Sequence, residues 1–206
     1  FDLSYLRMMP GMAVMAPATP DELVAMLAVA LRGAGPCAIR YPRGRAGLDA
    51  AGELESIAHG RAAVLRDGED VALLAVGTMV GPALASAALL ADLGIDAAVV
   101  NARFIKPLDL ETLLRVAGRV SRLVTIEENV VAGGFGTAVA QALSEQGLAI
   151  PCTHLGIPDR FVEHGARAML LRRLGLDAEG IVAAVTTALS GAPRPAPSPS
   201  PAADRG

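Results

Sequence analysis

The chain has 206 residues, 52% of them hydrophobic, and a formal net charge of −3. The hydrophobic content is sufficient for a globular core, and the charge argues against a nucleic-acid-binding surface while leaving room for a local basic pocket. No apolar run approaches the ~20 residues that span a bilayer, and no signal peptide is visible, so we expect a cytoplasmic protein without nucleic-acid or membrane partners.

The start of the sequence indicates a missing upstream part. The chain opens at Phe1 without a methionine, and residues 1–7 contain no recognisable start of a helix or strand. We therefore expect a piece of a longer protein, with part of its chemistry encoded upstream of Phe1.

Residues 1–45 have the pattern of the end of an α/β domain. An apolar run over 12–16 predicts a strand, and Thr19 is a suitable N-cap for a helix over 21–32. A second strand is expected over 36–41. Together these segments predict a closing β-α-β unit.

In residues 46–69 the apolar residues have no regular spacing, apart from a short strand candidate at 60–65, which indicates a domain linker. Regular spacing returns over 70–189 as alternating strands and helices, which predicts an α/β domain with a mostly parallel, helix-covered sheet. The strands are expected at 71–76, 97–102, 122–127 and 152–156, and the helices at 80–93, 109–118, 137–146 and 178–189. Residues 190–206 are rich in Pro, Ala and Ser and predict a disordered tail.

The strand predicted over 36–41 ends in a candidate binding residue. Pro42 cannot continue a central strand and Gly44 permits a turn, so Arg43 is presented at a strand end, where open α/β sheets bind ligands. The planar guanidinium suits a phosphate or carboxylate, which predicts binding of a phosphorylated small molecule. Arg40 lies within the strand and is expected to form an ion pair or to lie at an edge.

The glycine-rich run 133–136 follows a strand and opens a helix, as dinucleotide-binding loops do. The fit is poor because Val139 stands where the last glycine is needed and no acidic residue follows on the next strand. Glu127 and Glu128 would also repel a pyrophosphate. We expect a tight turn with close helix packing instead.

The run 101–109 ends a strand and enters a helix, with two cations between. One interpretation is a strand exit followed by an N-terminal helix cap. The other is a subunit or domain contact, in which Arg103 and Lys106 pair with Glu127 and Glu128 at the end of the next strand.

The residue types that bind metals or act as nucleophiles show no productive spacing. Cys37 and Cys152 lie far apart in strand-like runs, which predicts two buried, reduced thiols rather than a zinc site. His59, His154 and His164 share no spacing, and no Ser or Cys has an evident base partner, so each histidine is expected to be structural. We expect neither a metal site nor a catalytic residue within the chain.

Five motifs follow one another along the chain: FDLSYLR at 1–7, AIRYPRG at 38–44, NARFIKPLD at 101–109, TIEEN at 125–129 with GGFG at 133–136, and LGIPD at 155–159. Together they resemble one enzyme family, the bacterial 1-deoxy-D-xylulose-5-phosphate synthases, over their C-terminal third. These are thiamine-diphosphate enzymes of the transketolase superfamily. The resemblance covers about residues 1–189 and leaves the Pro/Ala/Ser tail unmatched.

The resemblance implies that residues 1–45 end the domain that binds the cofactor's aminopyrimidine, and that 70–189 form a transketolase C-terminal-like domain. Such enzymes use thiamine diphosphate and Mg²⁺ to condense pyruvate with D-glyceraldehyde 3-phosphate, releasing carbon dioxide, for isoprenoid, thiamine and pyridoxal biosynthesis. A homodimer is expected from the family. The arginine that binds the phosphate of glyceraldehyde 3-phosphate falls on Arg43.

The family's cofactor-activating glutamate, its metal and diphosphate site, and a substrate-binding Asp and His are absent from this chain. The resemblance therefore implies an inactive piece of an active enzyme. Because the Asp/His segment precedes Phe1, Asp2, Tyr5 and Arg7 are expected to line or brace the pocket. A transketolase, a 2-oxo acid dehydrogenase β subunit and a non-catalytic dimerisation module remain the alternatives.

Overall fold

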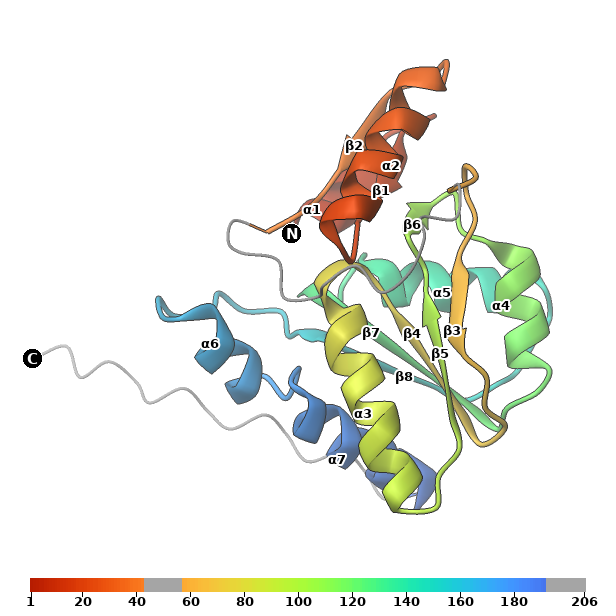
Figure 1. Cartoon of the computed structure of the whole chain (residues 1–206), viewed down its shortest axis with the longest axis vertical. Coiled ribbons are helices and arrows are strands. Elements are labelled where there is room, and N and C mark those ends of the chain that lie inside the picture. Colours follow the sequence, from red (N-terminus) through yellow and green to blue (C-terminus); the bar gives the residue numbers. More distant parts are fainter. Residues whose placement is uncertain (43–56, 192–206) are drawn as a thin grey trace, which may run out of the picture.

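A computed structural model describes residues 1–42 and 57–191 of the chain. Within these residues two sheets form, one of three strands and one of five (Figure 1). The smaller sheet is built mainly from the first 42 residues, which we call the N-terminal unit. No helix in the described ranges is long and apolar enough to cross a membrane.

The N-terminal unit consists of helix α1 (Asp2–Arg7), strand β1 (Ala13–Met15), helix α2 (Pro20–Arg32) and strand β2 (Cys37–Ile39). Strands β1 and β2 are parallel and α2 connects them, so the predicted β-α-β unit is confirmed. The Thr19 hydroxyl accepts a hydrogen bond from the Glu22 amide at 3.1 Å, which caps α2 as expected.

Strand β6 (Phe104–Lys106) completes the small sheet from a distant part of the sequence. It pairs antiparallel with β1, giving the order β2-β1-β6. Phe104 is fully buried with Met15, Met26, Val29 and Ile57 in the core between this sheet and α2. The N-terminal unit therefore takes part of its core from the second half of the chain.

The larger sheet has the order β3-β5-β4-β7-β8. Its strands are β3 (Ala63–Arg66), β4 (Val71–Ala75), β5 (Ala97–Asn101), β7 (Arg122–Val130) and β8 (Cys152–Ile157). All neighbouring pairs are parallel except the antiparallel edge pair β3 and β5. The predicted mostly parallel α/β sheet is thus confirmed.

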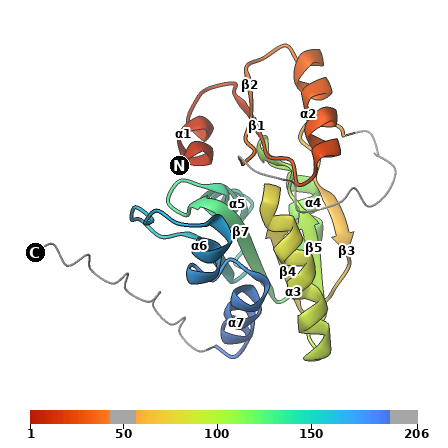
Figure 2. The same ribbon diagram turned by 60° about the vertical axis from the view of Figure 1, so that its left-hand side comes forward.

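Helices cover both faces of the larger sheet (Figure 2). They are η1 (Gly77–Met79), α3 (Val80–Asp92), α4 (Leu110–Ala117), α5 (Phe135–Glu145), α6 (Arg167–Arg173) and α7 (Ala178–Leu189). Leu73 of β4 packs toward α3 and α7, whereas Leu74 packs toward α4 and α5. This alternation explains why β4 is apolar throughout, since a strand covered on both faces has no solvent side.

Three short elements differ from the sequence-based expectation. Residues 2–7 form α1 although no helix start was recognised, and β6 and α6 were not predicted either. The expectation of two buried thiols is wrong for Cys37, which is exposed because β2 is an edge strand. Cys152 is partly buried, and burial raises the pKa of its thiol to about 12. The expected disordered tail falls almost entirely outside the described residues.

Candidate functional site

The carboxyl edge of the larger sheet is the natural position for a binding site. Strand β4 lies between β5 and β7 in the sheet. The chain places β5 on one side of β4 first and β7 on the other side afterwards, so the strand order reverses at β4. Open α/β sheets bind ligands in the crevice beside such a switch point. Here the turn after β4 brings Thr78 to this edge, and the end of β7 brings Glu128. The N-terminal unit lies over the same edge (Figure 1).

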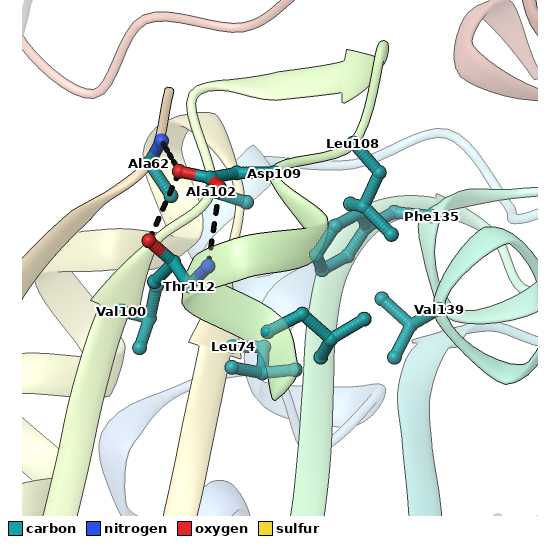
Figure 3. A pocket seen from close by; sticks show the side chains of 10 residues that line it. Ala62, Leu74, Val100, Ala102, Leu108, Asp109, Thr112, Phe135 and Val139 are labelled. Atoms are coloured by element: carbon teal, nitrogen blue, oxygen red, sulfur yellow. Dashed lines mark hydrogen bonds between the residues drawn. The ribbon is translucent and has the colours of Figure 1, made fainter. Parts of the chain in front are cut away.

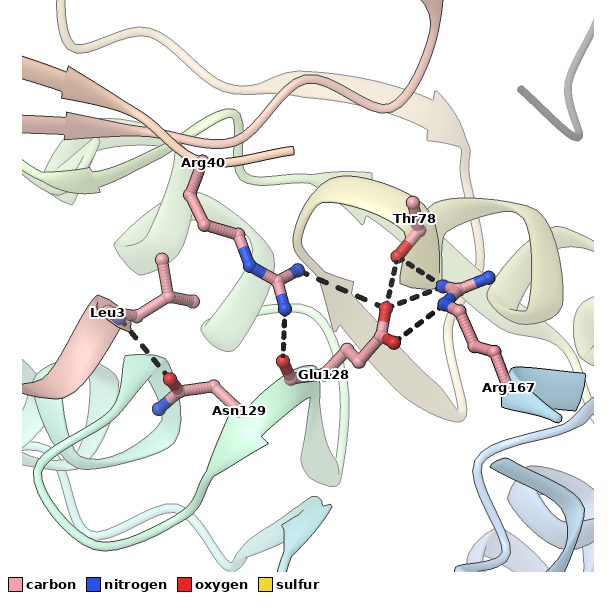
Figure 4. Close-up of polar contacts among 6 residues, drawn as sticks. All are labelled: Leu3, Arg40, Thr78, Glu128, Asn129 and Arg167. Atoms are coloured by element: carbon pink, nitrogen blue, oxygen red, sulfur yellow. Dashed lines mark hydrogen bonds and ion pairs between the residues drawn. The ribbon is translucent and has the colours of Figure 1, made fainter. Parts of the chain in front are cut away.

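Glu128 is the centre of a polar cluster at this edge (Figure 4). Its carboxylate accepts hydrogen bonds from the Thr78 hydroxyl at 2.8 Å and from Nε of Arg167 at 2.7 Å. Arg40, which follows β2, donates to the Glu128 backbone carbonyl at 2.9 Å, and its second nitrogen lies 3.9 Å from the carboxylate. Burial alone would raise the pKa of Glu128, but the bonds from Arg167 and Thr78 outweigh it and hold the pKa below its usual range.

Glu127 points the opposite way and occupies the N-terminus of α5. Its two carboxylate oxygens accept the amides of Phe135 at 2.7 Å and Gly136 at 2.8 Å. Its side chain is fully buried, and burial raises its pKa to about 7 although the two amides oppose the shift. A carboxylate of the protein thus takes the place that a phosphate would need at this helix end.

The glycines around this turn are required by close packing. A Cβ atom on Gly134 would lie 2.2 Å from Oε2 of Glu127, and one on Gly136 would lie 2.6 Å from Nδ1 of His154. Gly133 adopts a positive φ of 70°. The expectation of a tight turn with close helix packing for 133–136 is confirmed.

The neighbouring residue, Asn129, contacts helix α1. Its Oδ1 accepts the Leu3 amide at 3.2 Å (Figure 4). Its Nδ2 donates to the Ser4 hydroxyl at 2.9 Å. At the other end of α1, Nζ of Lys106 donates to the carbonyls of Arg7 at 3.0 Å and Met9 at 2.7 Å. Both ends of α1 are therefore held by side chains of the second half of the chain.

The predicted pocket residues of α1 have different surroundings. The Tyr5 hydroxyl donates to Asp2 at 2.9 Å on the exposed side of the helix, and this bond together with the Asp2 charge raises the pKa of Tyr5. Arg7 donates to the carbonyl of Gly133 at 2.5 Å and of Gly134 at 3.3 Å. Arg7 thus braces α1 against the glycine turn.

Arg43, the predicted phosphate ligand, lies outside the described residues. Arg40, three positions earlier, is described and forms the ion pair that was expected of it. Thr78 and Arg167 were not singled out from the sequence. Thr78 could have been found, because it follows a strand that neighbours β7 at the carboxyl edge. No sequence signal marks Arg167.

The predicted partners of the two cations in 101–109 are wrong. Arg103 binds Glu22 of α2 at 2.7 Å rather than Glu127 or Glu128, and Lys106 binds carbonyl oxygens of the N-terminal unit. The backbone of Arg103 has a φ of 57°, and this turn directs the chain away from the larger sheet. The expected domain contact nevertheless exists.

The helix cap expected in the same run is present as well. Asp109 caps α4 by accepting the Thr112 amide at 3.1 Å and also accepts the Ala62 amide at 2.9 Å. It lies at the rim of a small cavity between the larger sheet and helices α4 and α5 (Figure 3). Apart from Asp109 and Thr112, which bond to each other, the lining is apolar, so this cavity offers little to a charged ligand. Its lining residues are Ala62, Leu74, Val100, Ala102, Leu108, Asp109, Thr112, Leu113, Phe135 and Val139.

Within residues 1–42 and 57–191, no group of three or more His, Cys, Asp or Glu side chains could hold a metal ion. Glu127 and Glu128 are each occupied by donors of the protein itself. His154 is likewise part of the packing beneath α5, where its Nδ1 lies 2.8 Å from the Thr125 hydroxyl. The described residues therefore do not fit a metal-bound diphosphate.

Comparison with known families assigns both parts of the chain. The transketolase C-terminal domain matches residues 60–181, and the transketolase pyrimidine-binding domain matches residues 1–47. The chain belongs to the transketolase family. The fold class expected from the motifs, the end of a pyrimidine-binding domain followed by a transketolase C-terminal-like domain, is confirmed.

Curated relatives show which enzymes within this family the chain resembles. The 1-deoxy-D-xylulose-5-phosphate synthase of Pelotomaculum thermopropionicum is 53% identical over 189 residues, covering 90% of this chain and 29% of the relative. That of Gloeobacter violaceus is 49% identical and covers 94% of this chain and 31% of the relative. The resemblance to this synthase family is confirmed, and the chain spans less than a third of the length of these relatives.

Solved structures agree with this fold. A split-gene transketolase, described as an inactive β4 tetramer, superposes with a TM-score of 0.82 and 37% identity, over 92% of this chain and 60% of that chain. The transketolase of Campylobacter jejuni superposes with a TM-score of 0.69 over 90% of this chain and 27% of that chain, at 21% identity. The second comparison supports the fold alone.

Proposed function

We propose that this chain forms the C-terminal part of an enzyme that condenses pyruvate with D-glyceraldehyde 3-phosphate into 1-deoxy-D-xylulose 5-phosphate and carbon dioxide. The observation that carries this proposal is the 53% identity, over 90% of the chain, to a protein named for that activity. The activity belongs to a longer protein, since this chain corresponds to 29% of that relative. We expect the chain to be inactive alone.

Arg43 is the residue that we propose to bind the phosphate of glyceraldehyde 3-phosphate. It stands in the Arg-Tyr-Pro-Arg-Gly motif, four positions after the last residue of β2 in the sequence. Binding energy gained at a remote phosphate can orient the aldehyde for carbon–carbon bond formation. Asp2, Tyr5 and Arg7 would line or brace the same pocket from α1.

Thiamine diphosphate and Mg²⁺ are the cofactors that we propose for the complete enzyme. We expect the Mg²⁺ ligands from other residues, because the described part of the chain contains no group of three or more His, Cys, Asp or Glu side chains that could hold a metal ion. A cytoplasmic homodimer is the proposed form of the enzyme. The tetramer named for the split-gene transketolase supports self-association of a related chain.

A transketolase that acts on another acceptor is the second candidate. It is favoured by the split-gene transketolase, which superposes with a TM-score of 0.82. The two candidates also differ in donor, so the complete enzyme should be assayed with pyruvate plus glyceraldehyde 3-phosphate and with sugar-phosphate donors. Formation of deoxyxylulose phosphate supports the first candidate, and ketose transfer without pyruvate supports the second.

The phosphate role is tested with Arg43→Ala in the complete enzyme. We expect the apparent KM for glyceraldehyde 3-phosphate to rise by a factor that corresponds to about 2–5 kcal/mol, because a charge partner of the phosphate is lost. Pyruvate decarboxylation should change much less. Arg32→Ala, in the exposed last turn of α2, is the matched control. An equal loss in both half-reactions would rule out the anchoring role.

A further inference from the structure

We propose that Glu128 is a positioning residue, which through Arg40 and Arg167 fixes the end of β2 and the start of α6 at one edge of the larger sheet. Its kinetic consequence rests on the proposed function. The cluster joins four separate elements, since Thr78 comes from η1, Glu128 from β7, Arg167 from α6 and Arg40 from the end of β2 (Figure 4).

The charged side chains of this cluster are largely buried. The side chains of Glu128 and Arg40 are only 14% and 22% exposed, although both are charged. A carboxylate at this depth requires several donors to offset its lost hydration. Glu128 has donors from Thr78 and, through two nitrogens, from Arg167. Among the described residues, removal of the carboxylate would leave the Arg40 side chain with the backbone carbonyl of residue 128 as its partner.

The cluster occupies the crevice where a doubly wound sheet binds its ligand. In this chain the crevice contains a carboxylate and two guanidinium groups of the protein itself. A domain contact is thus built where other sheets of this type hold a small molecule. The Gly77 backbone adds to the contact, since a Cβ atom there would lie 3.2 Å from the side chain of Ala16.

The two segments that Glu128 holds, the end of β2 and the start of α6, both adjoin the proposed active-site region. Arg40 precedes Arg43, the proposed phosphate ligand, by three positions in the sequence. Arg167 ends the loop that carries Phe161, whose ring lies 5.7 Å from the ring of Phe1 at the start of α1. Glu128 contacts no proposed substrate residue itself, so its effect on the reaction would pass through Arg40.

The test uses Glu128→Gln in the complete enzyme, with Glu111→Gln as the matched control. Glu111 also pairs with an arginine, at 2.6 Å, but its side chain is 73% exposed. We expect the KM for glyceraldehyde 3-phosphate to rise about ten-fold or more in Glu128→Gln, with kcat and the KM for pyruvate nearly unchanged. The control should behave as wild type. Parallel losses in kcat and both KM values would indicate a merely structural role and overturn the proposal.

Arg40→Met provides the independent arm, because it removes the guanidinium and leaves Glu128 bound to Arg167. It should raise the same KM, and the double variant should show no larger increase than Arg40→Met alone, since Arg40→Met already removes the ion pair that Glu128→Gln breaks. Additive increases would overturn the proposal. Should Glu128→Gln fail to fold, Arg167→Gln replaces it, because the Arg167 side chain is 45% exposed.

Hydrogen exchange separates failure of this inference from failure of the proposed function. If the wild-type enzyme forms no deoxyxylulose phosphate, the proposed reaction is wrong and exchange decides the positioning role. We expect faster amide exchange in residues 39–41 and 158–167 of Glu128→Gln, and unchanged exchange in β4 and β5. Unchanged exchange in both tethered segments would overturn the inference.

Discussion

Glu127 is the most deeply buried carboxylate in the described part of the chain. Burial raises its pKa to about 7 from an ordinary value of 4.5. Between these two pH values the folded state binds a proton that the unfolded state has lost, so the contribution of Glu127 to stability falls as the pH rises. The decrease is complete above the folded pKa and amounts to at most about 3 kcal/mol.

We therefore expect the unfolding free energy of wild type, relative to Glu127→Gln, to decrease between about pH 5 and pH 7.5. The difference between the two proteins is needed because burial lowers the pKa of His154 below its ordinary value of 6.5, and this shift gives the opposite slope. Denaturant unfolding at a series of pH values measures it. Glu145→Gln, on the exposed end of α5, is the control and should run parallel to wild type. A constant difference between wild type and Glu127→Gln would contradict the prediction.

The directions of Glu127 and Glu128 also show what the sequence could not provide. Successive side chains of a strand point to opposite faces, so adjacent glutamates cannot share one partner region. Glu127 accepts amides of α5, whereas Glu128 meets Arg167 across the other face. The sequence predicted that Glu127 and Glu128 stand at a strand end, but with Arg103 and Lys106 as partners, which is wrong. It could not predict the partners, because Arg167 reaches Glu128 only through the path of the loop before α6.

At the scale of elements, α1 shows how tertiary contacts create a helix. Six residues are too few for a stable isolated helix. Leu3 is 1% exposed in the core of the larger sheet, and the helix ends are held by Asn129 and Lys106. The helix is thus specified by residues more than 95 positions away in the sequence.

We expect Lys106→Met to accelerate amide exchange across residues 2–9 and to lower stability by about 1–2 kcal/mol, because two carbonyl groups lose their donor. Methionine retains the apolar stem of the lysine. Lys106 is the only lysine of the chain, so the loss cannot be compensated by a neighbouring ammonium group. Arg115→Met on the exposed face of α4 is the control. Protected amides in α1 of Lys106→Met would exclude the capping role.

The same reasoning explains which elements the sequence could predict. Strands β4 and β5 and helices α3 and α7 have strong apolar patterns, and the structure places them within one or two residues of the expectation. The missed elements, α1, β6 and α6, have between three and seven residues and depend on distant partners. Helix α6 also lacks a side-chain N-cap, so no local signal marks its start.

At the scale of the whole molecule, β6 joins the two sheets. The chain leaves the larger sheet after β5, and β6 then pairs with β1. The small sheet is therefore incomplete without the second half of the chain. Glu22 strengthens this connection by binding Asn101 at 2.9 Å and Arg103 at 2.7 Å. A division of the sequence into successive domains cannot reveal that β6 pairs with β1, because a strand of three residues carries too weak a sequence pattern.

Phe104 is the residue through which this connection can be tested. Its ring is fully buried in the core of the small sheet, so Phe104→Ala should weaken that sheet by about 3–5 kcal/mol. We expect the largest increase in hydrogen exchange in β1, α2 and β2, and a smaller one in β4, β5 and β7, because Phe104 packs in the core of the small sheet and not in the cores that line the larger sheet. Phe135→Ala, at the start of α5, should act most on β4, β5 and β7. If Phe104→Ala instead accelerates exchange equally in both sheets, the two sheets unfold together, coupled by β6 and by the core that Val14 and Ile105 share with the larger sheet.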